Sequence, residues 1–163
     1  SDLQAIVTAI GRRNRRHDPD ARLPLARIDL SGANFSGAHL ERANLDGAHL
    51  EGARLIEAHL EGASLYGAHL ERANLERAHL KGAILAGAHL EGADLDTARL
   101  ELAYLGGANL EGADLRLSNV TKEQIDLAHG DTETQLPTRL TRPEGWTAQA
   151  DSNVASSEGG PSA

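Results

Sequence analysis

The feature that most constrains this chain is a repeat of five residues that runs from about Ile28 to Lys122. Its centres are Leu30 and every fifth residue onward to Val120, which makes 19 repeats. An Ala stands two residues before each centre from Ala33 to Ala113, 17 times in a row. A five-residue period scatters the centres around an α-helix and puts successive centres on opposite sides of a straight strand. The chain must therefore bend once in every repeat.

Four near-right-angle bends close a square coil of four repeats, with the Ala and Leu of each repeat inside and the other three residues outside. Nineteen repeats then give about 4.75 coils and a rod roughly 20 to 25 Å long, at a spacing of about 4.8 Å between coils. Aromatic residues make up only 2% of the 163 residues, so the core must consist of Leu and Ala.

Units such as ANLDG at 43–47, ADLDT at 93–97 and ADLRL at 113–117 resemble the pentapeptide-repeat family. The resemblance implies an all-β fold, a right-handed quadrilateral parallel β-helix, and we expect short capping helices at both ends. The segments that flank the repeat are similar to those of certain bacterial members, some of which carry transmembrane helices upstream. That similarity implies a membrane-tethered parent as one origin of the chain.

Open coil ends expose backbone groups and apolar side chains, so we expect caps. Residues 2–10 have the apolar spacing of an amphipathic helix. Thr121 and Gln124 form a capping box that predicts a helix to about His129, ended by Gly130. The expected domains are a capping helix and basic linker at 1–27, the β-helix at 28–122, a helix and a segment folded back over the rod at 121–146, and a disordered tail at 147–163.

The composition excludes several classes of protein. The absence of Cys removes disulfides, thiolate metal sites and cysteine nucleophiles. No apolar run is long enough to span a bilayer, and the N-terminus does not have the pattern of a signal peptide. The expected location is therefore the cytoplasm, with the soluble domain of a membrane-tethered parent as the alternative. The chain contains no Met and begins at Ser1, which is typical of a processed piece.

His replaces the family's usual Asn or Asp before the centre of six repeats. Because one coil takes four repeats, these His fall into two columns on opposite faces, each followed two residues later by Glu or Lys. Stacked imidazoles with a nearby carboxylate are ligands for Zn²⁺, Ni²⁺ or Cu²⁺. Surface decoration multiplied by repeat duplication is the competing interpretation. The candidate metal ligands are His39, His49, His59, His69, His79, His89, Glu51, Glu71 and Glu91.

One face carries the outward apolar residues Tyr66, Ile84 and Tyr104, and Leu102 projects from the adjacent corner. A contiguous apolar patch on a charged rod indicates a contact. Its two competing occupants are a second copy of the protein and the chain's own segment 132–146. The tethered segment is favoured because its effective concentration is high.

The formal net charge is −8, of which −6 falls within residues 28–122. Some pentapeptide-repeat proteins mimic DNA and bind gyrase, but duplex DNA of this length carries roughly 13 charges by axial spacing, about twice as many. The basic cluster at 12–17 is interpreted as a solvated linker.

We therefore predict a non-enzymatic scaffold or interaction module with no cofactor. A mimic of DNA that binds a type II topoisomerase, and metal binding by the His and Glu columns, are the alternatives. Flat faces offer no pocket for catalysis, so no catalytic residue is assigned. The expected partner is a protein, with no direct binding of nucleic acid, membrane contact only through an upstream segment, and a monomeric or homodimeric chain.

Overall fold

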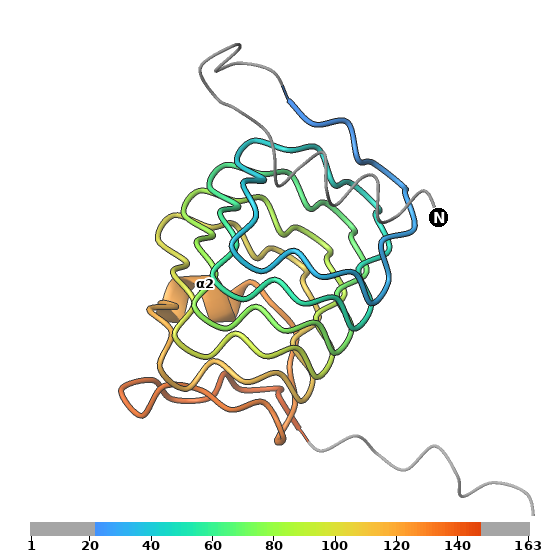
Figure 1. Ribbon diagram of the computed structural model, residues 1–163. Coiled ribbons are helices and arrows are strands. Elements are labelled where there is room, and N and C mark those ends of the chain that lie inside the picture. Colours follow the sequence, from blue (N-terminus) through green and yellow to red (C-terminus); the bar gives the residue numbers. More distant parts are fainter. Residues whose placement is uncertain (1–21, 148–163) are drawn as a thin grey trace, which may run out of the picture.

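The five-residue repeat folds into stacked coils of four repeats each. The structure is a computed structural model and describes residues 22–147. Parallel bridges join equivalent positions of neighbouring coils, from Pro24 with Asn44 to Asn109 with His129. Figure 1 shows the coils following one another from blue through green to yellow. Each bridge is isolated, because a repeat has only about three extended residues before the chain turns. Four repeats therefore form one coil, as the sequence predicts.

The interior is the predicted one of Leu and Ala. Every repeat centre from Leu30 to Val120 is at most 1% exposed, and the Ala two residues earlier is buried in each repeat from Ala43 to Ala113. Burial of one Leu side chain stabilises a fold by about 1.5 to 3 kcal/mol. Because all 19 centres point inward, the apolar core extends along the whole rod.

Backbone hydrogen bonds fix the coils in register. The Leu50 amide donates to the His69 carbonyl at 2.7 Å, and the His69 amide donates back to the Ala48 carbonyl at 2.9 Å. At each corner a turn closes with an amide to the centre three residues earlier, as from Ala53 to Leu50 at 3.0 Å. The third residue of that turn has a positive φ, for example 63° at Gly52, which explains the frequent Gly at this position.

The coil has four sides, here called faces A to D, and equivalent residues of successive coils form columns on each of them. Each face contains the repeat centres that recur once per coil. The centres are Leu45, Leu65, Leu85 and Leu105 on face A; Leu50, Leu70, Leu90 and Leu110 on face B; Leu55, Leu75, Leu95 and Leu115 on face C; and Leu40, Leu60, Leu80 and Leu100 on face D.

The first coil starts earlier than the sequence analysis placed it. Pro24 bridges to Asn44, and the Leu25 amide donates to the Asn44 carbonyl at 2.7 Å. Leu25 is 6% exposed, so it is a further inward centre before Ile28. The unusual sequence around Pro24 hides this repeat. The predicted helix at 2–10 and the basic cluster at 12–17 lie outside the described residues.

At the other end, the helix α2 (Lys122–Asp126) interrupts the repeat. The predicted capping box is present: the Thr121 hydroxyl accepts the Gln124 amide at 3.3 Å, and the Gln124 side chain accepts the Thr121 amide at 2.8 Å. Gln124 Nε2 also donates to the carbonyls of Leu100 and Ala103 at 2.7 and 2.8 Å. The Ala103 carbonyl thus receives from the Gln124 side chain the donor that a further coil would supply, as the Tyr104 amide does for the Ala83 carbonyl.

The helix ends at Asp126, three residues before the predicted end, because the chain returns to the coil. The Gly107 amide donates to the Leu127 carbonyl at 2.8 Å, and the Leu110 amide donates to the His129 carbonyl at 2.7 Å. Bridges from Asn109 to His129 and from Asp114 to Gln135 continue the columns. The prediction that segment 132–146 folds back over the rod is therefore wrong for residues up to Gln135, which extend the last coil.

Residues 136–147 then close the C-terminal end of the rod. Leu136 and Leu140 pack against the core, and Trp146 is 8% exposed. The Trp146 ring lies over Gly130, where an added Cβ would be 2.6 Å from Cε3. Gly130 is therefore needed for this contact rather than as the stop of a helix. Figure 1 shows this segment, in orange and red, at the opposite end of the stack from the first coil.

Two guanidinium groups supply the partners that the last coil would otherwise lack. Arg139 Nη2 donates to the carbonyls of Ser118 and Val120 at 3.1 and 2.8 Å. Arg142 donates to the carbonyls of Asp131, Thr132 and Thr134 at 3.0 to 3.1 Å. These carbonyls belong to the final turns, beyond which no coil follows within the described residues. The C-terminal segment is thus a cap made of side-chain donors and one buried aromatic ring.

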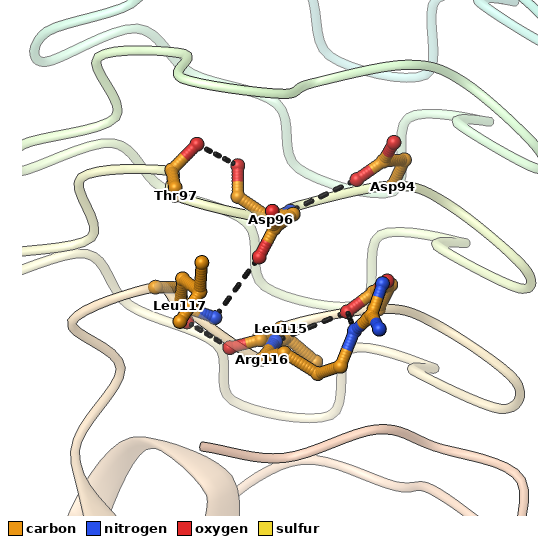
Figure 2. A network of polar contacts seen from close by, with 8 residues as sticks. Asp94, Asp96, Thr97, Leu115, Arg116 and Leu117 are labelled. Carbon is orange, nitrogen blue, oxygen red and sulfur yellow. Dashed lines mark hydrogen bonds and ion pairs between the residues drawn. The ribbon is translucent and has the colours of Figure 1, made fainter.

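On face C a carboxylate accepts a backbone amide that has no carbonyl partner in a further coil. Figure 2 shows Asp96, whose Oδ1 accepts the Leu117 amide from the neighbouring coil at 3.0 Å, while the Asp96 amide donates to Asp94 at 3.0 Å. Arg116 holds Asp114 through three contacts of 2.6 to 3.0 Å. This network stabilises the chain at the point where it leaves the repeat for α2.

Substitution of Arg139 by Ala should lower the free energy of unfolding by roughly 1 kcal/mol, because two backbone carbonyls lose a charged donor. Urea denaturation of the purified chain measures this loss. The control is Arg54→Ala, since Arg54 lies exposed on face C in mid-rod. Equal stability of the two variants would contradict a capping role for Arg139.

Candidate functional site

The outward residue before each centre decides what a column contains. Where this residue is Asn or Asp, its side-chain oxygen accepts the amide two residues later in all repeats before Asn119, as Asn44 does from Asp46 at 3.0 Å. Asn34, Asn74, Asp94, Asn109 and Asp114 make the same bond at 2.9 to 3.1 Å. The six predicted His occupy this position but have a different partner. The imidazoles therefore contact carboxylate side chains on the surface of the rod and not the backbone amide of the turn.

On face B, His49, His69 and His89 form a continuous stack. The ring centroids of neighbours are 4.7 Å apart, and the ring planes differ by only 4° and 3°. The Nδ1 atoms of the three rings lie 2.9, 3.3 and 3.5 Å from the carboxylates of Glu51, Glu71 and Glu91 respectively. The column of imidazoles thus runs beside a column of carboxylates, as the spacing predicts.

On face D, His39, His59 and His79 form the second stack, with centroids 4.7 and 4.6 Å apart and planes tilted by 17° and 26°. Carboxylates bridge the coils there: Glu61 Oε1 lies 3.4 Å from His59 Nδ1 and 3.7 Å from His79 Nδ1. Lys81 takes the place of a third Glu and lines a hollow together with Glu61, His79, Arg99 and Glu101. Face D therefore carries cations of its own beside its His column.

The Glu partners fix the state of the rings. In a neutral imidazole whose Nδ1–H donates to a carboxylate, the lone pair is on Nε2. The hydrogen bond to Glu51 raises the pKa of His49, against a smaller opposing effect of burial. Partial burial works to raise the pKa of Glu51, but hydrogen bonds with His49, its own backbone and Ser31 lower it. The paired charged forms of His49 and Glu51 thus stabilise each other.

The structure places all nine predicted ligands in these columns and groups eight of them in threes, with Glu91 outside the clusters. Each of four clusters, two on each face, has two imidazoles and one carboxylate whose ligand atoms lie within 4.8 Å of one another. Glu41 and Glu61 complete the clusters on face D, although the sequence analysis did not include them among the candidate ligands. The spacing that marked Glu51 also marks these two. The clusters are His39–Glu41–His59, His59–Glu61–His79, His49–Glu51–His69 and His69–Glu71–His89.

Face A carries the second candidate site. The predicted patch residues are all exposed, at 62% for Tyr66, 44% for Ile84, 83% for Leu102 and 52% for Tyr104. Ser64, Ile84 and Tyr104 form one column by successive bridges. The Tyr104 ring lies over Gly106, where an added Cβ would be 2.5 Å from Cζ. Because Ile84 bridges to Tyr104, the two side chains lie one coil apart in one column. We call Tyr66, Ile84, Leu102 and Tyr104 together the apolar strip of face A.

Leu127 is a fifth member of the apolar strip, and the sequence did not predict it. Its carbonyl accepts the Gly107 amide, the role that Tyr66 has for Gly47 and Gly106 has for Gly87. Leu127 therefore extends the column of Tyr66 and Gly106, and its side chain is 53% exposed. The helix α2 replaces the Ala and Leu pattern of the repeat just before this position, which conceals Leu127 in the sequence.

The expectation that segment 132–146 covers face A is wrong. The four predicted patch residues are exposed, while Leu136, Leu140 and Trp146 pack on the core at the C-terminal end. Arg139 and Arg142 hold the segment there through the carbonyls of the last turns. Within the described residues, face A is open to a partner.

Comparison with known proteins gives one family. Residues 25–62, 63–101 and 83–121 match the family model for pentapeptide repeats, in 8 copies. Similar solved structures include HetL, a pentapeptide repeat protein involved in heterocyst differentiation regulation from Nostoc sp. strain PCC 7120, at 26% identity over 63% of this chain and 67% of that one, with a TM-score of 0.43. Rfr23 from Cyanothece 51142 is 30% identical over 70% and 88%, with a TM-score of 0.40.

A pentapeptide repeat protein of the Arabidopsis thaliana thylakoid lumen is 26% identical over 76% of this chain and 87% of that one, with a TM-score of 0.35. The search of curated proteins found no match. Among residues 22–147, no helix has the length and apolarity to cross a membrane.

Replacement of Glu51 by Gln should lower the pKa of His49, because the carboxylate that holds its protonated form is removed. NMR titration of the imidazole signals measures the change. The raised pKa means that the contact stabilises the fold at pH below about 6.5, the ordinary value, and loses this effect as the pH rises through the His49 pKa. Glu61→Gln on the opposite face is the control, and an equal shift of His49 in both variants would contradict the assignment.

Proposed function

Because the chain belongs to the pentapeptide-repeat family, whose members fold as right-handed β-helices and are generally structural or interaction modules, we propose that it is a non-enzymatic module that binds a protein partner through face A. The rod is a rigid support, since its coils are held by the backbone ladder and by a continuous core. Rigid solenoids present residues at fixed spacing on an extended surface. The proposal assigns that role to the apolar strip of face A.

The observation that carries the proposal is the distribution of exposed apolar residues. The described residues include six large hydrophobic side chains that are exposed. Five of them lie on face A or its two corners, and Leu117 alone lies elsewhere, on the corner between faces C and D. Charged residues dominate faces B and D, so the apolar area is concentrated rather than scattered. Concentrated apolar area on a polar surface is typical of a protein contact.

The strip also has the residue types of an interface centre. Tyr66 and Tyr104 have large rings with a polar end, and such residues dominate binding energy in protein interfaces. A hollow of about 400 Å³ lies beside Ile84 and is lined also by Asn44 and Ser64 of the same column. Face A thus combines projecting rings with an adjacent recess, an arrangement that supports shape-specific contact.

Mimicry of DNA is the second function predicted from the sequence, with a type II topoisomerase as partner. Its support in the structure is limited to face B, where Glu51, Glu71, Glu91, Glu111 and Asp131 follow one another along one column. Arg99 and Lys81 interrupt the corresponding columns of face D, and duplex DNA is negative on all sides. The apolar strip therefore supports the interaction module more strongly.

Tyr104→Glu should weaken binding of the partner at least about tenfold, because it buries a charge at the centre of the contact. The immobilised chain would be used to isolate partners from the source cell, and each would be purified and its affinity measured for wild type and variants. Leu117→Glu is the matched control, an exposed Leu on another corner.

Partners that bind the wild type and Leu117→Glu equally but lose affinity for Tyr104→Glu support the proposal. Equal affinity for all three chains would overturn it. Sedimentation equilibrium separates the case of a second copy, in which the wild type self-associates and only Tyr104→Glu becomes monomeric. Inhibition of gyrase supercoiling that Tyr104→Glu leaves unchanged would instead favour the DNA mimic.

A further inference from the structure

The stacked imidazoles of face B have a different use from the strip of face A. We infer that face B is a binding site for one first-row transition-metal ion of the Zn²⁺, Ni²⁺ or Cu²⁺ type, held between adjacent coils with His69 as the shared ligand. This inference is independent of the proposed protein partner, because the two surfaces use different columns. Its support comes from the donor set, from unbalanced charge and from the freedom of the side chains.

The donor set is the one that these ions prefer. His49–Glu51–His69 and His69–Glu71–His89 each offer two imidazole nitrogens and one carboxylate oxygen within 4.8 Å. Imidazole with carboxylate is a common ligand combination for Zn²⁺ and suits Ni²⁺ and Cu²⁺ as well. In a neutral ring, the hydrogen bond from Nδ1 to the neighbouring Glu leaves the lone pair on Nε2, as the outer partner of a metal-bound His does. A Glu that itself binds the ion gives up this hydrogen bond.

Two carboxylates of face B each have a buried oxygen whose negative charge is not balanced by a hydrogen-bond donor. Glu71 Oε2 and Glu91 Oε2 are buried and have no hydrogen-bond partner among the described residues. A buried anionic oxygen without a partner is costly, and a bound cation removes the cost. Glu61 Oε2 on face D is in the same condition, but Lys81 and Arg99 line the same hollow. The columns directly before and after the centres of face B contain no Lys or Arg among the described residues, and Arg72 is on the corner that follows Glu71. Face B therefore has less positive charge beside its carboxylates than face D.

The side chains are able to close around an ion. Adjacent rings stand 4.7 Å apart, whereas two ligands of a tetrahedral Zn²⁺ are about 3.3 Å apart at the usual bond lengths. The rings must therefore tilt toward each other. The side chains of His49, His69 and His89 are 46%, 34% and 45% exposed, which leaves room for this rotation.

His69 belongs to both clusters of face B, and this fixes the pattern of the result. An ion bound between His49 and His69 uses the same ring as one bound between His69 and His89. The chain should therefore bind one ion on face B, and loss of His69 should remove both ways of binding it. Loss of His49 or His89 should leave one cluster intact.

Calorimetric titration of the full chain with ZnCl₂ tests the inference, with NiCl₂ in parallel. His69→Asn should weaken binding at least tenfold, whereas His49→Asn and His89→Asn should each retain it within about threefold. The matched control is His59→Asn, which removes the shared ring of face D and should leave the affinity unchanged. All four variants should fold, since Asn44 and Asn74 already occupy this position and make a turn hydrogen bond there; circular dichroism checks this.

A second readout identifies the ligands. The electron paramagnetic resonance spectrum of the chain with one equivalent of Cu²⁺ should show coupling to two imidazole nitrogens in the wild type and in His59→Asn, and should lose this signature in His69→Asn. No heat of binding at micromolar metal, equal affinity in wild type and His69→Asn, or an equal loss in His59→Asn would each overturn the inference.

Discussion

Register between coils is the constraint on which the rest of this structure depends. Each coil takes four repeats, because four turns close a square and the amide of each centre then meets a carbonyl of the next coil. The Ala and Leu inside allow this geometry, since a small residue and a branched one alternate along every side. Once the register is set, the side chain at any outward position is stacked on the equivalent side chain of the preceding coil.

Stacking at this spacing gives the surface its character. A single His in a turn would be an ordinary surface residue, whereas three on one face become a column of parallel rings beside a column of carboxylates. In the same way, isolated apolar residues become the strip of face A when Ile84 and Tyr104 share a column. Like groups come into contact because the coil repeats, and buried carboxylate oxygens without partners follow on faces B and D. Both proposed sites are consequences of the register.

The period of the sequence was sufficient to predict the core and the columns. Ala two residues before the centre and Leu at the centre are inward in the structure, and the six His fall into the two predicted stacks. These features follow from counting repeats and grouping them in fours. The positions of Tyr66, Ile84, Leu102 and Tyr104 on and beside face A were found in the same way.

The positions that the sequence did not predict lie where the period is broken. Leu25 was missed because Pro24 disguises the first repeat, and Leu127 because α2 replaces the repeat pattern just before it. The C-terminal segment was expected over face A because it carries apolar residues and a tether. The segment lies instead at the end of the rod, because the backbone carbonyls of the final turns need hydrogen-bond donors. Arg139 and Arg142 supply these donors. Such unsatisfied backbone groups become visible only when the coil is built.

A direct test of the register between coils uses pyrene excimer fluorescence, because the chain has no Cys of its own. Cys introduced at Arg54 and Asn74, which are bridged on face C, would be labelled with pyrene maleimide. Neighbouring coils lie about 4.8 Å apart, so the two pyrenes should stack and give strong excimer emission. The same labels at Arg54 and Ser64, two repeats apart and on opposite faces, should give monomer emission only. Equal excimer emission from both pairs, or none from the first, would contradict the account.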